Sequence, residues 1–159
     1  ISIKLGAVIL TDDYLITDPP NDKEIYRLIK YIDNKFKVEL QYIKELCKGM
    51  FSLVGTGGTV INLAAMIHGV RETEFDEKLN GLIIKKKDIE LLFTKMKGMP
   101  EAERLNLNGL EPGREDIVLA GTLMVMKIMD YFEKDEIIVS YADLLEGILL
   151  QYMGGEKNG

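Results

Sequence analysis

The sequence predicts an α/β fold in which a mixed sheet is flanked by helices. Short apolar runs that are typical of strands alternate along the chain with longer segments of helical periodicity, and no internal repeat interrupts this order. The length of 159 residues, with 47% hydrophobic and 29% charged residues, is typical of a globular protein with a substantial core. We therefore expect a single domain over residues 1–153, followed by a flexible tail at residues 154–159.

The first half of the chain is predicted as strand, helix, strand and helix. Residues 2–10 alternate apolar and other side chains, which predicts a strand. After a break at two prolines, residues 22–48 place apolar side chains at helical spacing, and a glycine then ends this helix. Residues 50–54 are a short apolar run typical of a strand, and residues 60–67 are an apolar helical segment. The charged residues 71–78 show no strong period and are expected to form a connection.

The second half repeats the alternation. Residues 82–84 are a short apolar run that predicts a strand or the approach to a helix, and Asp88 is expected to cap the helix that follows. A strongly apolar helix is expected over residues 114–132, a buried strand over residues 136–140 and a last helix over residues 143–152.

The composition excludes several classes of protein. The net charge of -6 argues against binding to duplex nucleic acid, which requires a basic face. The chain has one cysteine, Cys47, no apolar run of about 18 residues that could span a bilayer and no visible signal peptide. We therefore expect a cytoplasmic protein without a membrane partner. Because the chain starts at Ile1 without a methionine, we also expect it to be part of a longer polypeptide.

A glycine-rich stretch at the expected junction of a strand and a helix is the main candidate for function. It consists of Gly55, Thr56, Gly57, Gly58 and Thr59. Glycines leave main-chain N–H groups uncovered, and the start of a helix adds unpaired amides and a positive dipole end. The stretch matches neither the dinucleotide fingerprint nor the P-loop. Its spacing therefore fits either an anion site or a tight connection between strand and helix.

Five motifs in a fixed order carry a family resemblance. They are Leu-Gly-Ala-Val-x-Leu-Thr at 5–11, Asp-Pro-Pro at 18–20, Gly-Thr-Gly-Gly-Thr-x-x-x-Leu-Ala at 55–64, Gly-Leu-Glu-Pro-Gly-Arg-x-Asp-Ile-x-x-Ala-Gly at 109–121 and Leu-x-Glu-Gly at 144–147. This ordered set covers nearly the whole chain. It resembles the exopolyphosphatase and guanosine pentaphosphate phosphohydrolase (Ppx/GppA) family.

The resemblance implies a fold and a reaction. The fold would be actin-like and sugar-kinase-like, with two ribonuclease-H-like domains that close over a phosphate-bearing ligand. This chain would be most of the second domain, without its first hairpin. The family hydrolyses a phosphoanhydride bond of polyphosphate or guanosine pentaphosphate and releases orthophosphate, commonly with Mg²⁺. The glycine stretch would then face polyphosphate or a guanosine polyphosphate in the cleft between domains.

The same resemblance limits what this chain does alone. The family's catalytic glutamate and its two phosphate-loop motifs would lie upstream of Ile1, so we expect no catalytic residue and no metal ligand in this chain. Its partner would be the missing N-terminal domain, and the isolated chain is expected to be inactive. The absent hairpin would leave an exposed sheet edge, which invites pairing with a second copy and predicts a homodimer.

Four positions depart from the family pattern. Tyr141 and Leu145 stand where the family has an aspartate and an arginine, and we interpret the joint loss of this pair as a structural replacement. Asn80 and Ile9 stand where many members carry a histidine and an arginine. These changes remove cationic groups that could hold a long polyphosphate.

Arg114 matches the arginine of the family motif and is the second candidate site residue. It is expected either to contact ligand or to pair with an acid such as Glu111. Other conspicuous residues have structural interpretations. Asp116 is expected to belong to a helix cap and His68 to a helix end. We expect a solvated helix start at Lys85, Lys86 and Lys87, and core packing of Met124, Met126 and Met129.

Two other functions remain open at the level of sequence. In an actin-like or sugar-kinase-like domain, the same glycine stretch would hold ATP, although sugar kinases lack the Gly-Leu-Glu-Pro-Gly-Arg run. A regulatory module would sense a phosphorylated nucleotide without turnover, and the altered positions near Ser140 are compatible with it.

Overall fold

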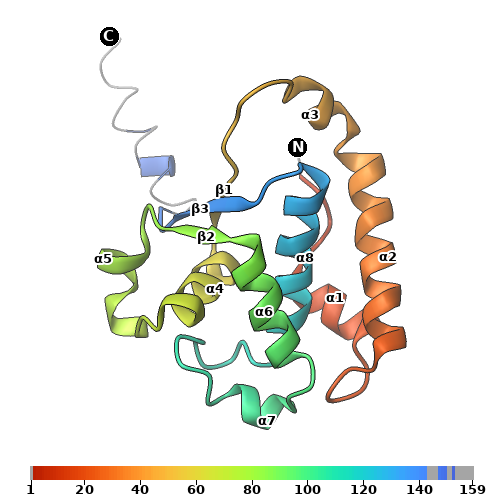
Figure 1. Ribbon diagram of the computed structural model, residues 1–159, viewed down its shortest axis with the longest axis vertical. Coiled ribbons are helices and arrows are strands. Elements are labelled where there is room, and N and C mark those ends of the chain that lie inside the picture. The colour runs from red at the N-terminus through yellow and green to blue at the C-terminus, as the bar shows by residue number, and fades with distance from the viewer. Residues whose placement is uncertain (1, 143–146, 150–151, 153–159) are drawn as a thin grey trace.

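The protein is a small mixed sheet flanked by helices (Figure 1), seen in a computed structural model that describes residues 2–142, 147–149 and 152. The elements in chain order are α1 (Ala7–Tyr14), α2 (Asp22–Glu39), α3 (Gln41–Leu46), β1 (Val54–Thr56), α4 (Gly58–His68), the 3-10 turn η1 (Glu72–Glu74), α5 (Phe75–Leu79), β2 (Ile83–Lys85), α6 (Lys86–Met96), α7 (Glu101–Arg104), α8 (Val118–Tyr131) and β3 (Glu136–Ser140).

The strand order β1-β3-β2 determines which loops meet. β1 runs parallel to β3, with Val54 opposite Ile138 and Thr56 opposite Ser140. β2 runs antiparallel to β3, with Ile83 also opposite Ile138. Because β1 and β3 are parallel, the segments that follow them leave the sheet at the same edge. In open α/β sheets this edge is the usual place for a ligand.

The two faces of the sheet differ in burial. Ile84, Ile137 and Val139 are buried in one hydrophobic cluster, together with side chains of α4, α5 and the C-terminal half of α8. On the opposite face, Val54 and Ile83 flank Ile138 across the three strands and are 58% and 49% exposed. One face of the sheet is therefore packed, and the other carries exposed apolar side chains.

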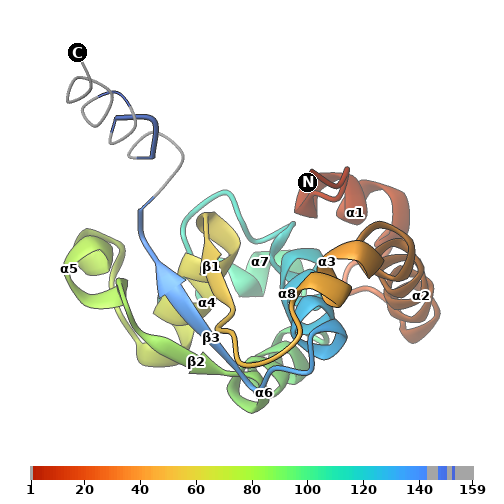
Figure 2. The same ribbon diagram turned by 90° about the horizontal axis from the view of Figure 1, so that it is seen from above.

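α8 lies at the centre of the protein and joins two hydrophobic clusters. Its residues Val125 and Met129 belong to the sheet cluster, whereas Leu119 and Leu123 belong to a second cluster formed with α1, α2 and α6. Figure 2 shows α1, α2 and α3 on the side of α8 remote from the sheet. A helix that is apolar nearly all round is expected to be buried in this way.

Several expectations are confirmed. The helices flank a mixed sheet, β3 has the expected bounds, and β2 lies within one residue of its expected place. Met129 is fully buried, and Met124 and Met126 pack against the core. The expected last helix and tail lie mostly outside the described residues, although residues 147–149 are helical.

The expected strand at residues 2–10 is wrong, because residues 7–14 form α1. Local alternation in this segment hides a helical spacing. Leu10 is buried against α8, Tyr14 packs against the same cluster, and Ala7 lies next to Gly121 of α8. Ala7, Leu10 and Tyr14 stand at positions i, i+3 and i+7, so they share one face of a helix. Their packing against α8 and its cluster therefore favours a helix, although the sequence alternates as in a strand.

The expected single helix at residues 22–48 is also wrong, because it divides at Leu40. The backbone of Leu40 leaves helical geometry at φ -105° and ψ 0°, and α3 starts at the next residue. Leu40 is 6% exposed in the second cluster. Burial of this side chain accompanies the change in direction, which continuous apolar spacing did not reveal.

Other boundaries differ in ways that matter near the candidate site. The expected connection at residues 71–78 contains η1 and most of α5, whose Phe75 is buried in the core. α7 was not expected, and α8 begins at Val118 rather than at residue 114. Asp88 lies in the first turn of α6, whose N-cap residue is Lys85, so its expected role as the cap is wrong.

Candidate functional site

The glycine stretch forms the junction between β1 and α4. Gly55 and Thr56 belong to β1, so the expected strand lies later in the chain than residues 50–54. Gly57 turns the chain with a φ of 87°, which glycine adopts without strain, and α4 starts at Gly58. No side chain caps the first turn of α4. The amides at the start of this helix therefore point toward the edge where β1 and β3 end.

The three glycines of the stretch have different roles. A Cβ on Gly55 would approach Ile137 Cδ1 to 2.7 Å and Val60 Cγ2 to 2.8 Å, so this glycine is required by core packing. Gly57 has open space around it and is required by its backbone angle. At Gly58, a Cβ would overlap the guanidinium of Arg114. Only Gly58 therefore makes room for a charged side chain at the start of the helix.

Arg114 is held against Gly58 by an ion pair with Glu111. Its Nε–H donates to Glu111 Oε2, so the terminal guanidinium nitrogens face Gly58. The Arg114 side chain is 34% exposed and that of Glu111 is 26% exposed. Arg114 lies in the turn before α8, since its carbonyl accepts from Val118 N. The expected pairing with Glu111 is confirmed, and the same arginine lies beside the glycine stretch.

Asn62 connects this ion pair to α4. Its side chain is 1% exposed and donates from Nδ2 to Glu111 Oε2 at 2.7 Å and to the Gly58 carbonyl at 2.8 Å. Its Oδ1 accepts from the Glu111 amide at 2.7 Å. The role of Asn62 was not predicted from the sequence. The signal that it carries is a lone amide within the apolar run of α4.

Two further glycines bring the Arg114 segment and α8 close to α4. A Cβ on Gly109 would lie 2.5 Å from the carbonyl carbon of Ala65, and Gly109 has a φ of 88°. A Cβ on Gly121 would lie 2.8 Å from Thr59 Cγ2. These close backbone approaches explain why two glycines of the 109–121 motif occupy their positions.

The remaining residues of this edge come from β3 and from the turn before β2. The Thr56 hydroxyl donates to the Ala142 carbonyl at 2.7 Å, and the Tyr141 amide donates to Asn80 Oδ1 at 3.0 Å. Asn80 and Tyr141, two of the four positions that depart from the family pattern, therefore lie together at this edge of the sheet, whereas Ile9 lies in α1. Leu145 lies outside the described residues.

The run Lys85–Lys87 lies at the opposite edge of the sheet. Lys86 pairs with Asp130 and with Glu90, and the hydrogen bond to Asp130 raises the pKa of Lys86. The expected solvated helix start is confirmed for Lys85 and Lys87, which are exposed at the start of α6, whereas Lys86 is half-buried in its ion pairs. His68 is the last residue of α4, as expected.

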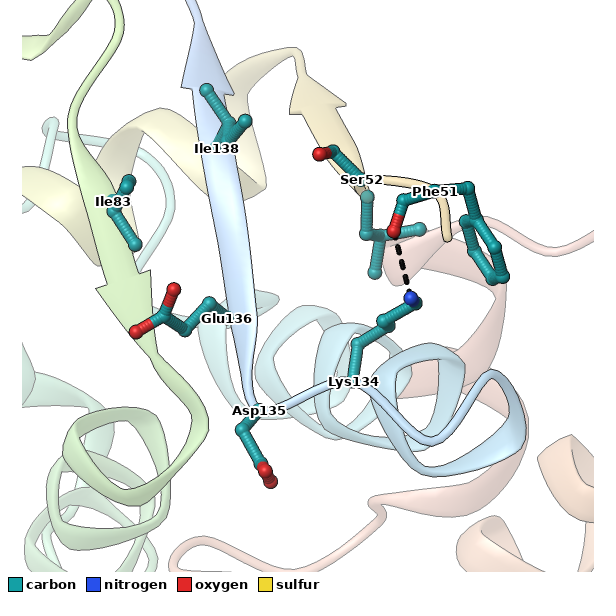
Figure 3. A pocket seen from close by; sticks show the side chains of 8 residues that line it. Phe51, Ser52, Ile83, Lys134, Asp135, Glu136 and Ile138 are labelled. Carbon is teal, nitrogen blue, oxygen red and sulfur yellow. Dashed lines mark hydrogen bonds between the residues drawn. The ribbon is translucent and has the colours of Figure 1, made fainter. Parts of the chain in front are cut away.

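A hollow lies toward the opposite edge of the sheet from the glycine stretch. It has a volume of about 460 Å³ and is lined by Phe51, Ser52, Lys134, Glu136 and neighbouring residues at the amino ends of β1 and β3 (Figure 3). Lys134 Nζ donates to the Phe51 carbonyl at 2.7 Å. Two carboxylates, those of Asp135 and Glu136, line the same hollow. It is therefore unsuited to a polyanion.

The described residues offer no cluster of side chains for a magnesium ion. Across residues 2–142, 147–149 and 152 no group of three or more histidine, cysteine, aspartate or glutamate side chains could hold a metal ion. Glu111, the carboxylate beside the glycine stretch, is already bound to Arg114 and Asn62. We therefore derive no step through a metal from this chain.

A match to a family profile shows to which protein family the chain belongs. The profile of the Ppx/GppA phosphatase family matches residues 1–156. The chain belongs to the Ppx/GppA phosphatase family. This confirms the resemblance that the ordered motifs indicate.

Curated relatives of this Ppx/GppA-family chain carry two kinds of name. A bifunctional 3-dehydroquinate synthase/phosphatase of Fusobacterium nucleatum is 30% identical over 154 residues, which are 95% of this chain and 22% of that protein. Exopolyphosphatase 2 of Mycobacterium tuberculosis is 26% identical over 159 residues, with 96% of this chain and 48% of that protein covered. The chain thus spans less than half the length of these relatives.

Solved structures show the same fold. A Ppx/GppA phosphatase of Aquifex aeolicus in its type II variant has a TM-score of 0.84 and 30% identity, covering 96% of this chain and 49% of that chain. Another structure of the Aquifex aeolicus family member has a TM-score of 0.86 and 29% identity, covering 100% and 50%. Within the described part of this chain, no helix has the length and apolar character needed to cross a membrane.

Proposed function

We propose that this chain supplies the ligand-closing half of an interdomain cleft in a phosphoanhydride hydrolase. The substrate is inorganic polyphosphate or guanosine pentaphosphate, and the product is orthophosphate. The observation that carries the proposal is the position of Arg114 against Gly58 at the uncapped start of α4. Membership of the Ppx/GppA phosphatase family supports the reaction class.

The chemistry of the site suits a phosphate group. Main-chain N–H groups at a helix start and a guanidinium are both donors to anionic oxygens, and the helix dipole adds to their attraction. In the described contacts between the two side chains, Glu111 accepts from Arg114 through Nε–H alone. The two terminal nitrogens of Arg114 therefore face the glycine stretch. In this proposal they bind a phosphate of the substrate and stabilise the charge that builds up on its oxygens during transfer.

The water-activating base and the magnesium ligands belong, in this proposal, to the other domain of the whole protein. Phosphoanhydride hydrolysis requires a group that orients water and cations that neutralise the transferred phosphoryl group. The isolated chain is therefore expected to release no orthophosphate from polyphosphate. Release above the level of a Gly58→Asp variant of the same chain would contradict this division of roles.

The test uses the whole protein and two substrates. Orthophosphate release is measured with inorganic polyphosphate and with guanosine pentaphosphate, for the wild type, Gly58→Asp and Gly98→Asp. Gly58→Asp places a carboxylate at the helix start and displaces Arg114, so kcat/KM is expected to fall by about 100-fold or more. Gly98 has open space around it, and the same substitution there is the matched control.

The outcomes separate the candidate functions. Turnover of either substrate that depends on Gly58 and not on Gly98 supports the hydrolase. If neither substrate is turned over, two parallel assays decide: binding of guanosine pentaphosphate in a calorimetric titration would favour the sensor, and turnover of ATP would favour the kinase-like alternative. Equal activity of Gly58→Asp and the wild type would overturn the proposed role of the glycine stretch.

A further inference from the structure

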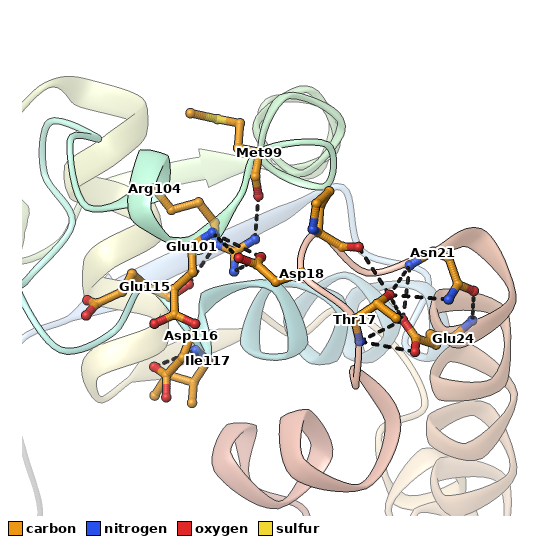
Figure 4. A network of polar contacts seen from close by, with 11 residues as sticks. Thr17, Asp18, Asn21, Glu24, Met99, Glu101, Arg104, Glu115, Asp116 and Ile117 are labelled. Carbon is orange, nitrogen blue, oxygen red and sulfur yellow. Dashed lines mark hydrogen bonds and ion pairs between the residues drawn. The ribbon is translucent and has the colours of Figure 1, made fainter.

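Arg104 is a buried arginine that binds three separate parts of the chain (Figure 4). Its side chain is 4% exposed. Its Nη1 donates to the Met99 carbonyl at 2.7 Å, its Nε to the Glu115 carbonyl at 2.7 Å, and its Nη2 to Asp18 Oδ1 at 3.3 Å. A guanidinium is the side-chain group that can direct three donors to acceptors on different segments.

Two of these acceptors are the ends of the segment that carries Arg114. Met99 follows α6, and Glu115 is the residue next to Arg114. Residues 99–115 contain only the short helix α7, and the backbone hydrogen bonds internal to this segment run from Pro100 to Leu110, before the residues that carry Glu111 and Arg114. By binding both ends, Arg104 closes this segment into a loop and limits the backbone positions open to Arg114.

We call Arg104 with its three acceptors, on Met99, Glu115 and Asp18, the Arg104 clamp. Asp18 attaches this clamp to the rest of the protein. Its two carboxylate oxygens accept from the Glu101 amide at 3.0 and 2.9 Å, so it binds the start of α7 as well as Arg104. The neighbouring Thr17 hydroxyl donates to Glu24 Oε2 at 2.6 Å, and this hydrogen bond lowers the pKa of Glu24. Glu24 completes the capping box of α2 with Asn21. The Arg104 clamp is therefore attached to the start of α2, which its capping box holds with several hydrogen bonds.

We propose that Arg104, together with Asp18, is a positioning residue for Arg114. Arg104 sets the backbone of the 99–115 segment, and Glu111 and Asn62 then orient the Arg114 side chain over Gly58. The catalytic consequence of this inference rests on the proposed function of the glycine stretch. Arg104 itself does not contact the substrate in this account.

The experiment is a double-mutant cycle in the whole protein with inorganic polyphosphate as the probe. The variants are Arg104→Lys, Arg114→Ala and the combination of both. Lysine keeps the charge but cannot reach three acceptors, so Arg104→Lys is expected to raise KM by about tenfold. In the Arg114→Ala background the same change is expected to alter KM by less than about twofold, since the residue through which it acts is gone.

The matched control is the exposed ion pair between Lys97 and Asp22. It joins the end of α6 to the start of α2 at 3.8 Å without binding the 99–115 segment. Asp22→Asn is expected to leave KM unchanged. If Arg104→Lys does not fold, Asp18→Asn takes its place, because it keeps an acceptor oxygen while removing the charge that pairs with Arg104.

A second measurement, without substrate, separates this inference from the proposed function. Exchange of the Arg114 Nε–H with water is followed by NMR, and it is expected to accelerate in Arg104→Lys because the Glu111 bond is loosened. Faster exchange with an unchanged KM in Arg114→Ala would contradict the proposed function and support the positioning role. Unchanged exchange, or equal effects of Arg104→Lys on KM in both backgrounds, would overturn the positioning role.

Discussion

The guanidinium of Arg114 lies against the α-carbon of Gly58, where any side chain would overlap it. This contact joins the start of α4 to the turn before α8, two segments more than 50 residues apart. Glu111 Oε2 accepts from the Nε–H of this arginine, and Asn62 Nδ2 donates to the same oxygen and so holds Glu111 in place. The packing of the protein therefore brings a cation to an uncapped helix start.

Gly109→Ala is expected to destabilise the protein more than Gly113→Ala. Both glycines have positive φ, but a Cβ on Gly109 would collide with the Ala65 backbone, whereas one on Gly113 meets open space. We expect a loss of roughly 1 kcal/mol at Gly113 and at least about 2–3 kcal/mol at Gly109. Urea unfolding of the two variants measures the difference, and equal losses would contradict the close approach.

Asn62→Leu is expected to destabilise the protein by about 1–3 kcal/mol, because it removes three hydrogen bonds and leaves the Glu111 carboxylate and amide without their Asn62 partners. It should also raise KM in the whole protein, since Arg114 loses the support of a fixed Glu111. Asn34→Leu, on the exposed surface of α2, is the control for the same chemical change. An Asn62→Leu protein as stable as this control would contradict the buried network.

Asp130 is expected to contribute stability that disappears in acid. Burial raises its pKa, but hydrogen bonds from Lys86 and Lys127 outweigh burial and hold the pKa below its ordinary value. A carboxylate with a lowered pKa in the folded state stabilises above the unfolded-state pKa of about 4, and this contribution is lost as the pH falls through that range.

The measurement for Asp130 is urea unfolding of the wild type and Asp130→Asn between pH 3 and pH 7. We expect the wild type to be more stable at pH 7 by no more than about 1 kcal/mol, because the carboxylate is partly exposed. The difference should shrink below about pH 4. Asp12→Asn, at an exposed position of α1, controls for the change in net charge. A difference that grows in acid would contradict the sign.

The edge of β1 leads to an expectation about the isolated chain. Among the described strands, β1 pairs with β3 on one side only. An unpaired strand edge favours pairing with another chain. We expect the isolated chain to form a dimer at micromolar concentrations in sedimentation velocity, and a monomer over that range would contradict it.

Local patterns in the sequence predicted the parts of the fold that local chemistry determines. The helix α8 was predicted because burial on most of its faces leaves a nearly continuous apolar sequence, and β3 was predicted from the short apolar run that places Ile137 and Val139 in the core. The segment at residues 2–10 was mispredicted because its alternation and its helical spacing coexist, and only contact of Leu10 with α8 decides between them. Leu40 breaks its helix for a similar tertiary reason.

The candidate site was predictable only in part. The glycine stretch and the pairing of Arg114 with Glu111 follow from residue type and spacing in the chain. The role of Asn62 and the clamp around Arg104 depend on contacts between segments 49 and 86 residues apart. A glycine such as Gly55 is typical of a loop. Here, however, glycine is required because the side chains of Ile137 and Val60 pack against this position. Spacing alone cannot distinguish these reasons for glycine.

We propose that Gly58 makes room for Arg114 at a phosphate-binding helix start, and Gly58→Ala in the whole protein is the decisive variant for this proposal. Alanine adds one methyl group, which displaces the flexible end of Arg114 rather than the backbone. We expect the KM for inorganic polyphosphate to rise about tenfold, with a melting temperature close to that of the wild type and of Gly98→Ala. An unchanged KM in a folded Gly58→Ala protein would contradict it.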